Sequence, residues 1–352
     1  MDEISERIYF DRAADEVFDQ ADEWLITFKN HYANINASFL GIYADDSEIM
    51  SGVDSKKMSR NNKAYSKGLK TFRNRMNSNK NAWCEVCMPS VAWAKKAFPE
   101  QSEEEAMASL WLAILKSTRA DQDDPIQAWK EHQLRQDAKI EELNTLKFTS
   151  LKYKNSLGTN LIVELPEKHI WRGCTNTHAI DAYKFIPNMP GEEIFTLPKK
   201  TGVNGRVVGS YPLVYDGVVI RDFWFEFEDG LVVDYGASEN LSTLREILET
   251  DKGAKFLGEV ALVPYDSPIS NQGILFYDTL FDENASCHFA LGQVYPFCIE
   301  GGEDMSEEEL EESGVNTSMT HVDFMIGTDD LEIIGLTKEG EEVLVFSQGN
   351  FI

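Results

Sequence analysis

The chain has 352 residues, and its length, 42% hydrophobic and 11% aromatic content predict sizeable cores in two domains. Its formal net charge of −27 argues against nucleic acid or anionic membranes as partners, because phosphate groups bind basic surfaces. No apolar run is long enough for a membrane span, and the acidic start lacks the apolar core of a signal peptide. The five cysteines are scattered, which is typical of reduced thiols. We therefore expect a soluble cytoplasmic protein.

The first 145 residues predict alternating helices and strands. Apolar residues recur at helical spacing over residues 1–36, and residues 38–44 have the composition of a short strand. The helices expected further along cover residues 90–97, 102–116 and 126–143, the last two with typical capped starts. This alternation is typical of an α/β domain.

Two features of this half have both a functional and a structural interpretation. The basic segment 56–80 has the charge to bind an acidic partner, but a solvated helix face is the simpler interpretation. Cys84 and Cys87 form a lone CxxC motif. A zinc ribbon would need a second such pair, and a redox motif would need a thioredoxin-like setting, so we expect an ordinary strand that ends at Pro89.

After residue 145 the pattern changes to strands separated by glycine-rich turns. A hairpin is expected over residues 148–165, and the acidic stretch 303–312 predicts a solvated surface turn. The remaining strands are expected over residues 206–210, 218–227, 231–235, 259–264 and 320–326, with one helix over 240–253. The predicted fold class is α+β, with an α/β domain over residues 1–145 and a mainly antiparallel β domain over 146–352.

The most informative chemistry lies toward the C-terminal end of the chain. Glu259 lies inside an apolar, β-branched run, where a carboxylate is costly unless it is paired or bound to a metal. Glu283 and His288 are five residues apart, and His321 and Asp323 would share one face of a strand. Two imidazoles and several carboxylates suit zinc, cobalt or manganese better than calcium, magnesium or iron–sulfur clusters. The pattern therefore predicts a metal site.

Each of these segments also fits a purely structural interpretation. His321 and Asp323 could form a hydrogen-bonded surface pair, and Glu259 could be ion-paired in a core. Glu283 could be a solvated loop acid and His288 a packed imidazole. The metal interpretation gains weight because three such segments lie close together in a chain with only six histidines. No GxSxG motif, P-loop or dinucleotide fingerprint offers competing chemistry.

Five longer motifs resemble those of the thermophilic-type metalloaminopeptidases, the aminopeptidase S and aminopeptidase T family. They are PGEEIFT (190–196), LGEVALV (257–263), DSPISN (266–271), LFDENASCH (280–288) and HVDFMIG (321–327). They come in the order found in the family, and the resemblance extends from residue 40 to the C-terminus.

The resemblance implies a cytosolic aminopeptidase of broad specificity, acting on peptides with a free N-terminus. It also implies two divalent metal ions per subunit (zinc, cobalt, manganese or magnesium) and a homodimer whose active sites face an enclosed space.

The same resemblance assigns roles to individual residues. Carried over by motif, the metal ligands are Glu193, Glu259, Glu283, His288, His321 and Asp323, and Tyr295 matches a family tyrosine near the site. In the mechanism that we expect, Glu259 bridges the cations and handles the proton of the attacking water, with Glu283 as the second choice. Tyr295 would donate a hydrogen bond to the developing oxyanion.

The sequence departs from the family pattern at its start. Family members carry a few dozen further N-terminal residues, so the resemblance implies a first domain that is shortened there. This places the stability of that domain, the dimer and the substrate gate in question. Two alternatives stay open: a dinuclear metal hydrolase of another amide or ester, and a non-catalytic metal-binding scaffold that lost activity with the segment.

Overall fold

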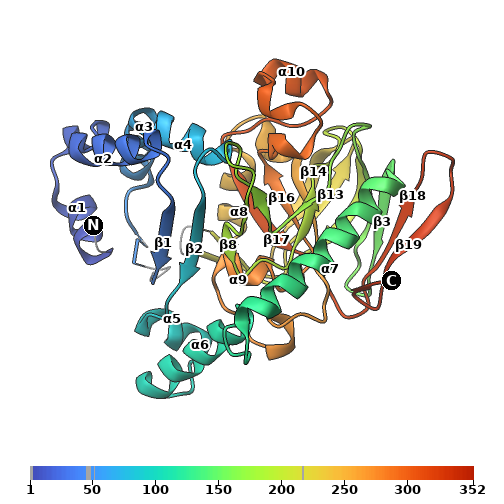
Figure 1. The fold of residues 1–352 in the computed structure, drawn as a ribbon, viewed down its shortest axis with the longest axis horizontal. Coiled ribbons are helices and arrows are strands. Elements are labelled where there is room, and N and C mark those ends of the chain that lie inside the picture. Colours follow the sequence, from blue (N-terminus) through green and yellow to red (C-terminus); the bar gives the residue numbers. More distant parts are fainter. Residues whose placement is uncertain (1–2, 45–48, 51, 216–217) are drawn as a thin grey trace. The chain divides into compact units, whose positions relative to one another are not determined.

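A computed structural model describes residues 3–44, 49–50, 52–215 and 218–352 (Figure 1). The chain forms two compact units: unit 1 comprises Met1–Trp111 and Thr175–Met189, and unit 2 comprises Leu112–Cys174 and Pro190–Ile352. The mixture of helices with mostly antiparallel sheets confirms the predicted α+β class. The domain boundary expected at residue 145 falls inside unit 2, at the end of a long helix, and stays a prediction.

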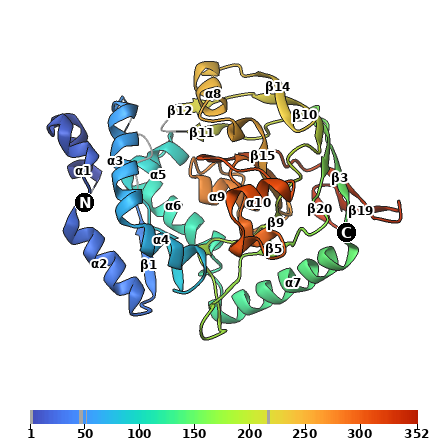
Figure 2. The same ribbon diagram turned by 90° about the horizontal axis from the view of Figure 1, so that it is seen from above.

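Unit 1 contains a small parallel sheet with helices between its strands (Figures 1 and 2). β1 (Phe39–Tyr43) and β2 (Trp83–Cys87) pair in parallel, and β8 (Asn188–Met189) pairs with the other edge of β2. The helices are α1 (Glu3–Arg12), α2 (Glu23–Asn34), α3 (Ser55–Gly68), α4 (Lys70–Asn77), α5 (Val91–Ala97) and α6 (Glu103–Ser117), the last of which crosses into unit 2. A short hairpin, β6 (Asn176–Thr177) with β7 (Lys184–Phe185), completes the unit. Parallel strands joined through helices agree with the predicted alternation.

Helix starts follow the capping residues in the sequence. Ser90 caps α5, and Ser102 and Glu105 form reciprocal hydrogen bonds at the start of α6. Asp124 accepts a hydrogen bond from the backbone N–H of Gln127 at the start of α7 (Pro125–Leu146). Within the described part of the chain, no helix is long and apolar enough to cross a membrane.

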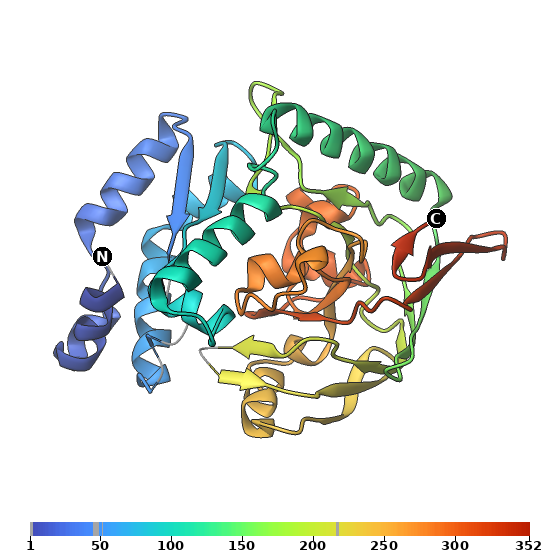
Figure 3. The ribbon, with the colours of Figure 1, turned by 90° about the horizontal axis from the view of Figure 1, so that it is seen from below.

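Unit 2 contains two antiparallel sheets (Figure 3). The eight-stranded sheet has the order β14 (Leu231–Gly236), β13 (Trp224–Glu228), β10 (Val203–Val208), β4 (Asn160–Glu164), β3 (Ser150–Lys154), β18 (Glu332–Leu336), β19 (Glu342–Ser347), β20 (Asn350–Phe351). The five-stranded sheet has the order β17 (His321–Met325), β16 (His288–Gly292), β15 (Leu257–Leu262), β9 (Ile194–Thr196), β5 (Arg172–Gly173). Smaller elements are the hairpin β11 (Leu213–Tyr215) and β12 (Val218–Ile220), and the helices α8 (Leu241–Leu248), α9 (Thr279–Glu283) and α10 (Glu307–Glu312).

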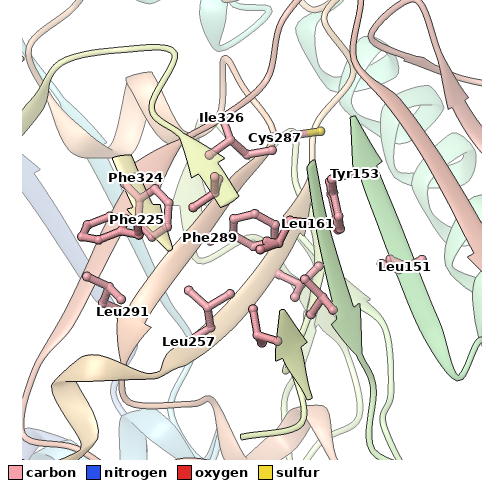
Figure 4. Close-up of a cluster of buried hydrophobic side chains, with 14 of the residues drawn as sticks. Leu151, Tyr153, Leu161, Phe225, Leu257, Cys287, Phe289, Leu291, Phe324 and Ile326 are labelled. Carbon is pink, nitrogen blue, oxygen red and sulfur yellow. The ribbon is translucent and has the colours of Figure 1, made fainter. Parts of the chain in front are cut away.

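The two sheets share one apolar core (Figure 4). The rings of Tyr153 on β3 and Phe289 on β16 have centroids 5.0 Å apart, and those of Phe225 on β13 and Phe324 on β17 are 5.2 Å apart. All four residues are at most 1% exposed. Burying a large apolar side chain stabilises a fold by roughly 1.5–3 kcal/mol, so this core holds the five-stranded sheet firmly against the larger one.

Several predictions about individual elements were wrong. Residues 218–227 form two strands rather than one, because the chain turns at Asp222 with a φ of 48°. The helix expected over 240–253 ends at Leu248. Strands β18, β19 and β20 were not predicted, and neither was the contribution of β8 to the parallel sheet.

Asp251, three residues after the end of that helix, joins two loops of unit 2. Its carboxylate accepts hydrogen bonds from the backbone N–H groups of Gly253 (2.8 Å), Ala254 (2.9 Å) and Met319 (2.6 Å) and from the Ser318 hydroxyl (2.9 Å). Burial alone would raise the pKa of Asp251, but these hydrogen bonds lower it below its usual value. A carboxyl group whose pKa is lowered in the folded state stabilises the fold above its unfolded-state pKa, and this contribution is lost as the pH falls.

We predict that Asp251→Asn lowers the free energy of unfolding at pH 7 by about 1–3 kcal/mol, because the amide replaces a charged acceptor of several hydrogen bonds. The difference from wild type should shrink as the pH falls from about 5 to below about 3.9, the usual pKa of an aspartate, because protonation removes the charge from the wild-type side chain. Urea unfolding at several pH values measures both effects. Asp329→Asn, at an exposed position, is the control; a difference that does not change with pH would contradict the prediction.

Candidate active site

The side chains of the five-stranded sheet alternate between two faces of different character. On its strand β16, Phe289 and Leu291 lie in the apolar core. Successive side chains of a strand point to opposite faces, so His288, Ala290 and Gly292 face away from that core. The second face is therefore available for polar chemistry while the first one anchors the sheet.

Direct strand pairing brings acidic residues to this second face. Glu259 on β15, Ala290 on β16 and Asp323 on β17 pair across the three strands. Directly paired residues of antiparallel strands share a face, so the two carboxylates flank the methyl group of Ala290. Gly292 pairs with His321 in the same way. The small residues of the middle strand leave space between the polar side chains of its neighbours.

A β-bulge turns Glu259 toward this face. The register between β15 and β16 shifts between Leu257 and Glu259, so Leu257 stays in the apolar core although it lies only two residues earlier. A Cβ atom on Gly258 would lie 2.4 Å from the carbonyl oxygen of Gln293 and 2.5 Å from that of Gly292. This close approach of two backbones requires glycine in the bulge.

The structure brings all six predicted ligands together. Three overlapping groups have ligand atoms within 4.8 Å of one another: Glu193, Glu259 and His288; Glu259, His321 and Asp323; and Glu283, His288 and Asp323. Glu193 immediately precedes β9 and Glu283 ends α9, whereas the other four residues lie on strands β15, β16 and β17. Glu259 and His288 are buried, and the other four are partly exposed, so the cluster is accessible from one side.

The imidazole rings direct their Nε2 atoms at the carboxylates. His288 Nε2 lies 3.3 Å from Glu193 Oε2 and 4.0 Å from Glu259 Oε1. His321 Nε2 lies 3.2 Å from Glu259 Oε2 and 3.2 Å from Asp323 Oδ1. The two carboxylate oxygens of Glu259 therefore face different imidazoles.

Backbone carbonyl groups hold both rings in this orientation. His288 Nδ1 lies 3.0 Å from the carbonyl oxygen of Ser286, and His321 Nδ1 lies 2.7 Å from that of Gln293. A carbonyl oxygen only accepts, so each Nδ1 carries the proton and donates it, and Nε2 is the atom that can coordinate a metal. Histidine ligands in proteins typically have such a partner on the second nitrogen, and the donor set therefore fits a divalent cation.

The electrostatics of the cluster also favour a cation. Burial raises the pKa of Glu259 to about 7, with a further contribution from Glu193, and burial together with Asp323 raises the pKa of Glu283 well above its usual value. Burial alone would lower the pKa of His288, but Glu193, Glu259 and Asp323 raise it to about 10. The crowded carboxylates thus favour the protonated forms of the groups in the cluster. Metal binding would displace these protons.

Tyr295 lies beside the cluster. The centroid of its ring is 5.0 Å from that of His321, and the ring stacks on Phe297 at 5.4 Å. Tyr295 is 39% exposed, so it can be reached by a substrate. Burial of the hydroxyl and the nearby Glu259 carboxylate raise its pKa well above the usual value, and the hydroxyl is therefore a hydrogen-bond donor at neutral pH.

Sequence reasoning missed the residues that support the candidate ligands. Gly258, Ala290 and Asn284 lie within or next to the recognised motifs, where their small size or amide group was a usable signal. Arg119 and His132 contact the segment before β9 from positions 73 and 59 residues away in the chain, and no local pattern could indicate these contacts.

A mixed carboxylate and imidazole cluster of this kind, on one face of an antiparallel sheet, is a candidate metal centre of the type found in hydrolytic enzymes. The chain belongs to the thermophilic metalloprotease family (M29), whose sequence model matches residues 1–351. This membership confirms the predicted family and the predicted class of enzyme, a metal-dependent peptidase.

Individual relatives agree with this assignment. The chain is 44% identical over 350 residues to aminopeptidase AmpS of Bacillus subtilis (strain 168), a match that covers 99% of this chain and 85% of that protein. It is 43% identical over 350 residues to aminopeptidase 2 of Geobacillus stearothermophilus, with 99% and 84% covered. The solved structure of wild-type AmpT from Thermus thermophilus is similar with a TM-score of 0.92 at 34% identity, covering 99% of this chain and 85% of that one.

We predict that Ala290→Leu weakens metal binding although it leaves every ligand in place, because the larger side chain fills the space between Glu259 and Asp323. The affinity for Co²⁺ should fall by roughly 10–100-fold, the range seen when the surroundings of a metal site are altered. Competition with a chromophoric chelator measures this affinity, and circular dichroism checks that the variant is folded, since overpacking costs about 1–3 kcal/mol. Ala290→Gly adds no volume and is the matched control. Wild-type affinity in Ala290→Leu would show that this position does not border the metal site.

Proposed function

We propose that this enzyme releases N-terminal amino acids from peptides through a water molecule activated by two divalent cations. The observation that carries the proposal is the assembly of all six candidate ligands on one face of the five-stranded sheet. The family is one of metalloproteases, and the named relatives are aminopeptidases, so the chain is a metal-dependent aminopeptidase. The number of cations and the roles of individual residues are the new content of the proposal.

Two cations suit the charge and the geometry of the cluster. Four carboxylates and two neutral imidazoles carry four negative charges, which two divalent cations balance. Glu259 is the best candidate for a bridging ligand, because its Oε1 is 4.0 Å from His288 Nε2 and its Oε2 is 3.2 Å from His321 Nε2. When bound, two such cations lower the pKa of a shared water and polarise the scissile carbonyl. Zinc, cobalt and manganese suit this nitrogen and oxygen set, with magnesium as the less favoured choice.

The residues of the chain supply the remaining chemistry. Glu259 would take the proton of the attacking water and return it to the leaving amine, and Glu283, a member of one ligand group only, is the second choice. The protonated hydroxyl of Tyr295 donates a hydrogen bond to the developing oxyanion. A carboxylate of the cluster, or a cation held by it, would bind the free amine of the substrate. This requirement explains why cleavage starts at the N-terminus.

We also propose a cytoplasmic location and a homodimer whose active sites face an enclosed space. The odd number of scattered cysteines, five, and the net charge of −27 support a reducing compartment and a protein that does not adhere to anionic membranes. The dimer follows from the resemblance to the family. A hydrolase of another amide or ester and a non-catalytic scaffold are not favoured, because the relatives are aminopeptidases and the complete ligand set is assembled.

We predict that chelation abolishes cleavage of aminoacyl chromogenic substrates, and that zinc, cobalt or manganese restores it. N-acetylated versions of the same substrates should stay uncleaved under every metal, because they lack the free amine. Initial rates with each metal added back singly, together with the metal content of the protein, measure this. Cleavage of the acetylated substrates would point to the broader hydrolase, and no cleavage by the folded, metal-loaded protein would support the scaffold.

We predict that Glu259→Gln lowers kcat by roughly 10²–10⁴-fold, because the amide cannot accept the proton of the attacking water. The variant should stay folded, since the amide has the same shape as the carboxylate. Glu332→Gln, at an exposed position on β18, is the matched control and should keep wild-type turnover. Metal content is measured in parallel to separate a proton-transfer role from loss of a ligand. Turnover near that of wild type in Glu259→Gln would remove this residue from the mechanism.

A further inference from the structure

Two of the six candidate ligands are not held by strand pairing. The other four, Glu259, His288, His321 and Asp323, lie on strands β15, β16 and β17, whose backbone ladder fixes their positions. Glu193 lies just before β9, and Glu283 is the last residue of the short helix α9. A metal site tolerates only small displacements of its ligands, so these two residues need another source of rigidity.

Asn284 connects the two segments that carry these ligands. It follows Glu283 and is 1% exposed. Its Oδ1 accepts a hydrogen bond of 2.6 Å from the backbone N–H of Glu192, the residue before Glu193. Its Nδ2 donates to the carbonyl oxygen of Leu280 at 2.8 Å and lies 3.5 Å from Glu283 Oε1. One buried amide group thus joins the segment of Glu193 to the segment of Glu283.

A buried ion pair fixes the first of these segments from its other side. The carboxylate of Glu192 forms a bidentate pair with the Arg119 guanidinium, in which Nη2 is 2.9 Å from Oε2, and the two side chains are 4% and 9% exposed. The same Nη2 lies 3.1 Å from His132 Nδ1, and His132 Nε2 donates to the carbonyl oxygen of Gly191 at 2.7 Å. The backbone and side-chain groups of residues 191–192 therefore have partners on several sides.

Stability alone does not explain this arrangement. Removing two charges from water is costly, and a buried ion pair is often no more stabilising than apolar residues of the same volume. A network of this kind is, however, geometrically demanding, because each partner must adopt one position to satisfy the others. It lies directly before Glu193 and directly after Glu283, where fixed geometry benefits metal binding.

We propose that Asn284 is a positioning residue that holds Glu193 and Glu283 at the spacing needed for metal binding, with the buried Arg119–Glu192 pair as its anchor. This inference rests on the proposed function, in which both glutamates are metal ligands. The competing explanation is that Asn284 only terminates α9, since its Nδ2 donates to the carbonyl oxygen of Leu280, four residues earlier. The two explanations differ in what they predict for metal affinity.

The test compares Asn284→Ala with Asn155→Ala in the full chain. Asn155 is also a buried amide of unit 2: its Oδ1 accepts from the backbone N–H of Thr159, and its Nδ2 donates to the carbonyl oxygen of Ile326. These hydrogen bonds join Thr159 and Ile326 rather than the segments of the two glutamates, so its removal reports the effect of losing a buried amide alone. Affinity and stoichiometry for Co²⁺ are measured by chelator competition and visible absorption, and thermal unfolding of the metal-free proteins measures stability.

We expect Asn284→Ala to bind Co²⁺ roughly 10–100-fold more weakly than wild type, and Asn155→Ala to bind it as wild type does even where its thermal stability is lower. If Asn284→Ala does not fold, Asn284→Asp serves in its place, because it keeps the acceptor for Glu192 but loses the donor toward Glu283. The same weakening of Co²⁺ binding is expected. Wild-type affinity in a folded Asn284 variant would overturn the proposal and leave the helix-terminating role.

Glu193→Gln and Glu283→Gln separate this inference from the proposed function. If both weaken Co²⁺ binding while the Asn284 variants do not, the ligand assignment stands and the positioning role of Asn284 is wrong. If neither glutamate variant changes Co²⁺ affinity or stoichiometry, the ligand assignment itself is wrong, and the positioning role is overturned together with it.

Discussion

The crowding of four carboxylates on one face of a sheet is the constraint on which the rest of the structure depends. Like charges at such short range oppose ionisation, and the pKa of about 7 for Glu259 reflects its burial first and this repulsion second. Such a cluster persists only if the fold prevents its members from moving apart and if positive charge is supplied. The supporting features of unit 2 can each be understood as meeting one of these two requirements.

The opposite face of the same sheet prevents the carboxylates on its strands from moving apart. Phe289 and Phe324 project from β16 and β17 into the core shared with the eight-stranded sheet, and their strand neighbours His288 and Asp323 project into the site. Because alternation couples the two faces, a shift of a ligand-bearing strand would disturb the aromatic packing of the core. The apolar core therefore determines the spacing of the candidate metal ligands as well as the stability of the unit.

The sequence was most informative for structural features that one local segment determines. Glu259 inside an apolar run and the alternation of His321 with Asp323 predicted both the strands and the chemistry. Capped helix starts such as Ser102 were equally local. Outcomes that depend on distant partners were missed: β8 joins a sheet begun far earlier in the chain, and Arg119 pairs with a residue 73 positions away. The break at Asp222 was also missed, because a left-handed φ at a non-glycine residue is a weak sequence signal.

The motifs that resemble those of the family are longer than the candidate ligands alone would require, because they also contain residues that position the ligands. LGEVALV contains one candidate ligand, Glu259, but also Gly258, whose lack of a side chain permits the bulge that turns the glutamate toward the site. LFDENASCH contains Glu283 and His288, and between them Asn284 and Ser286, whose amide and backbone carbonyl orient the neighbouring ligands. Residues without any metal chemistry thus occupy fixed places beside the ligands, because a metal centre requires a defined spacing as much as it requires donor atoms.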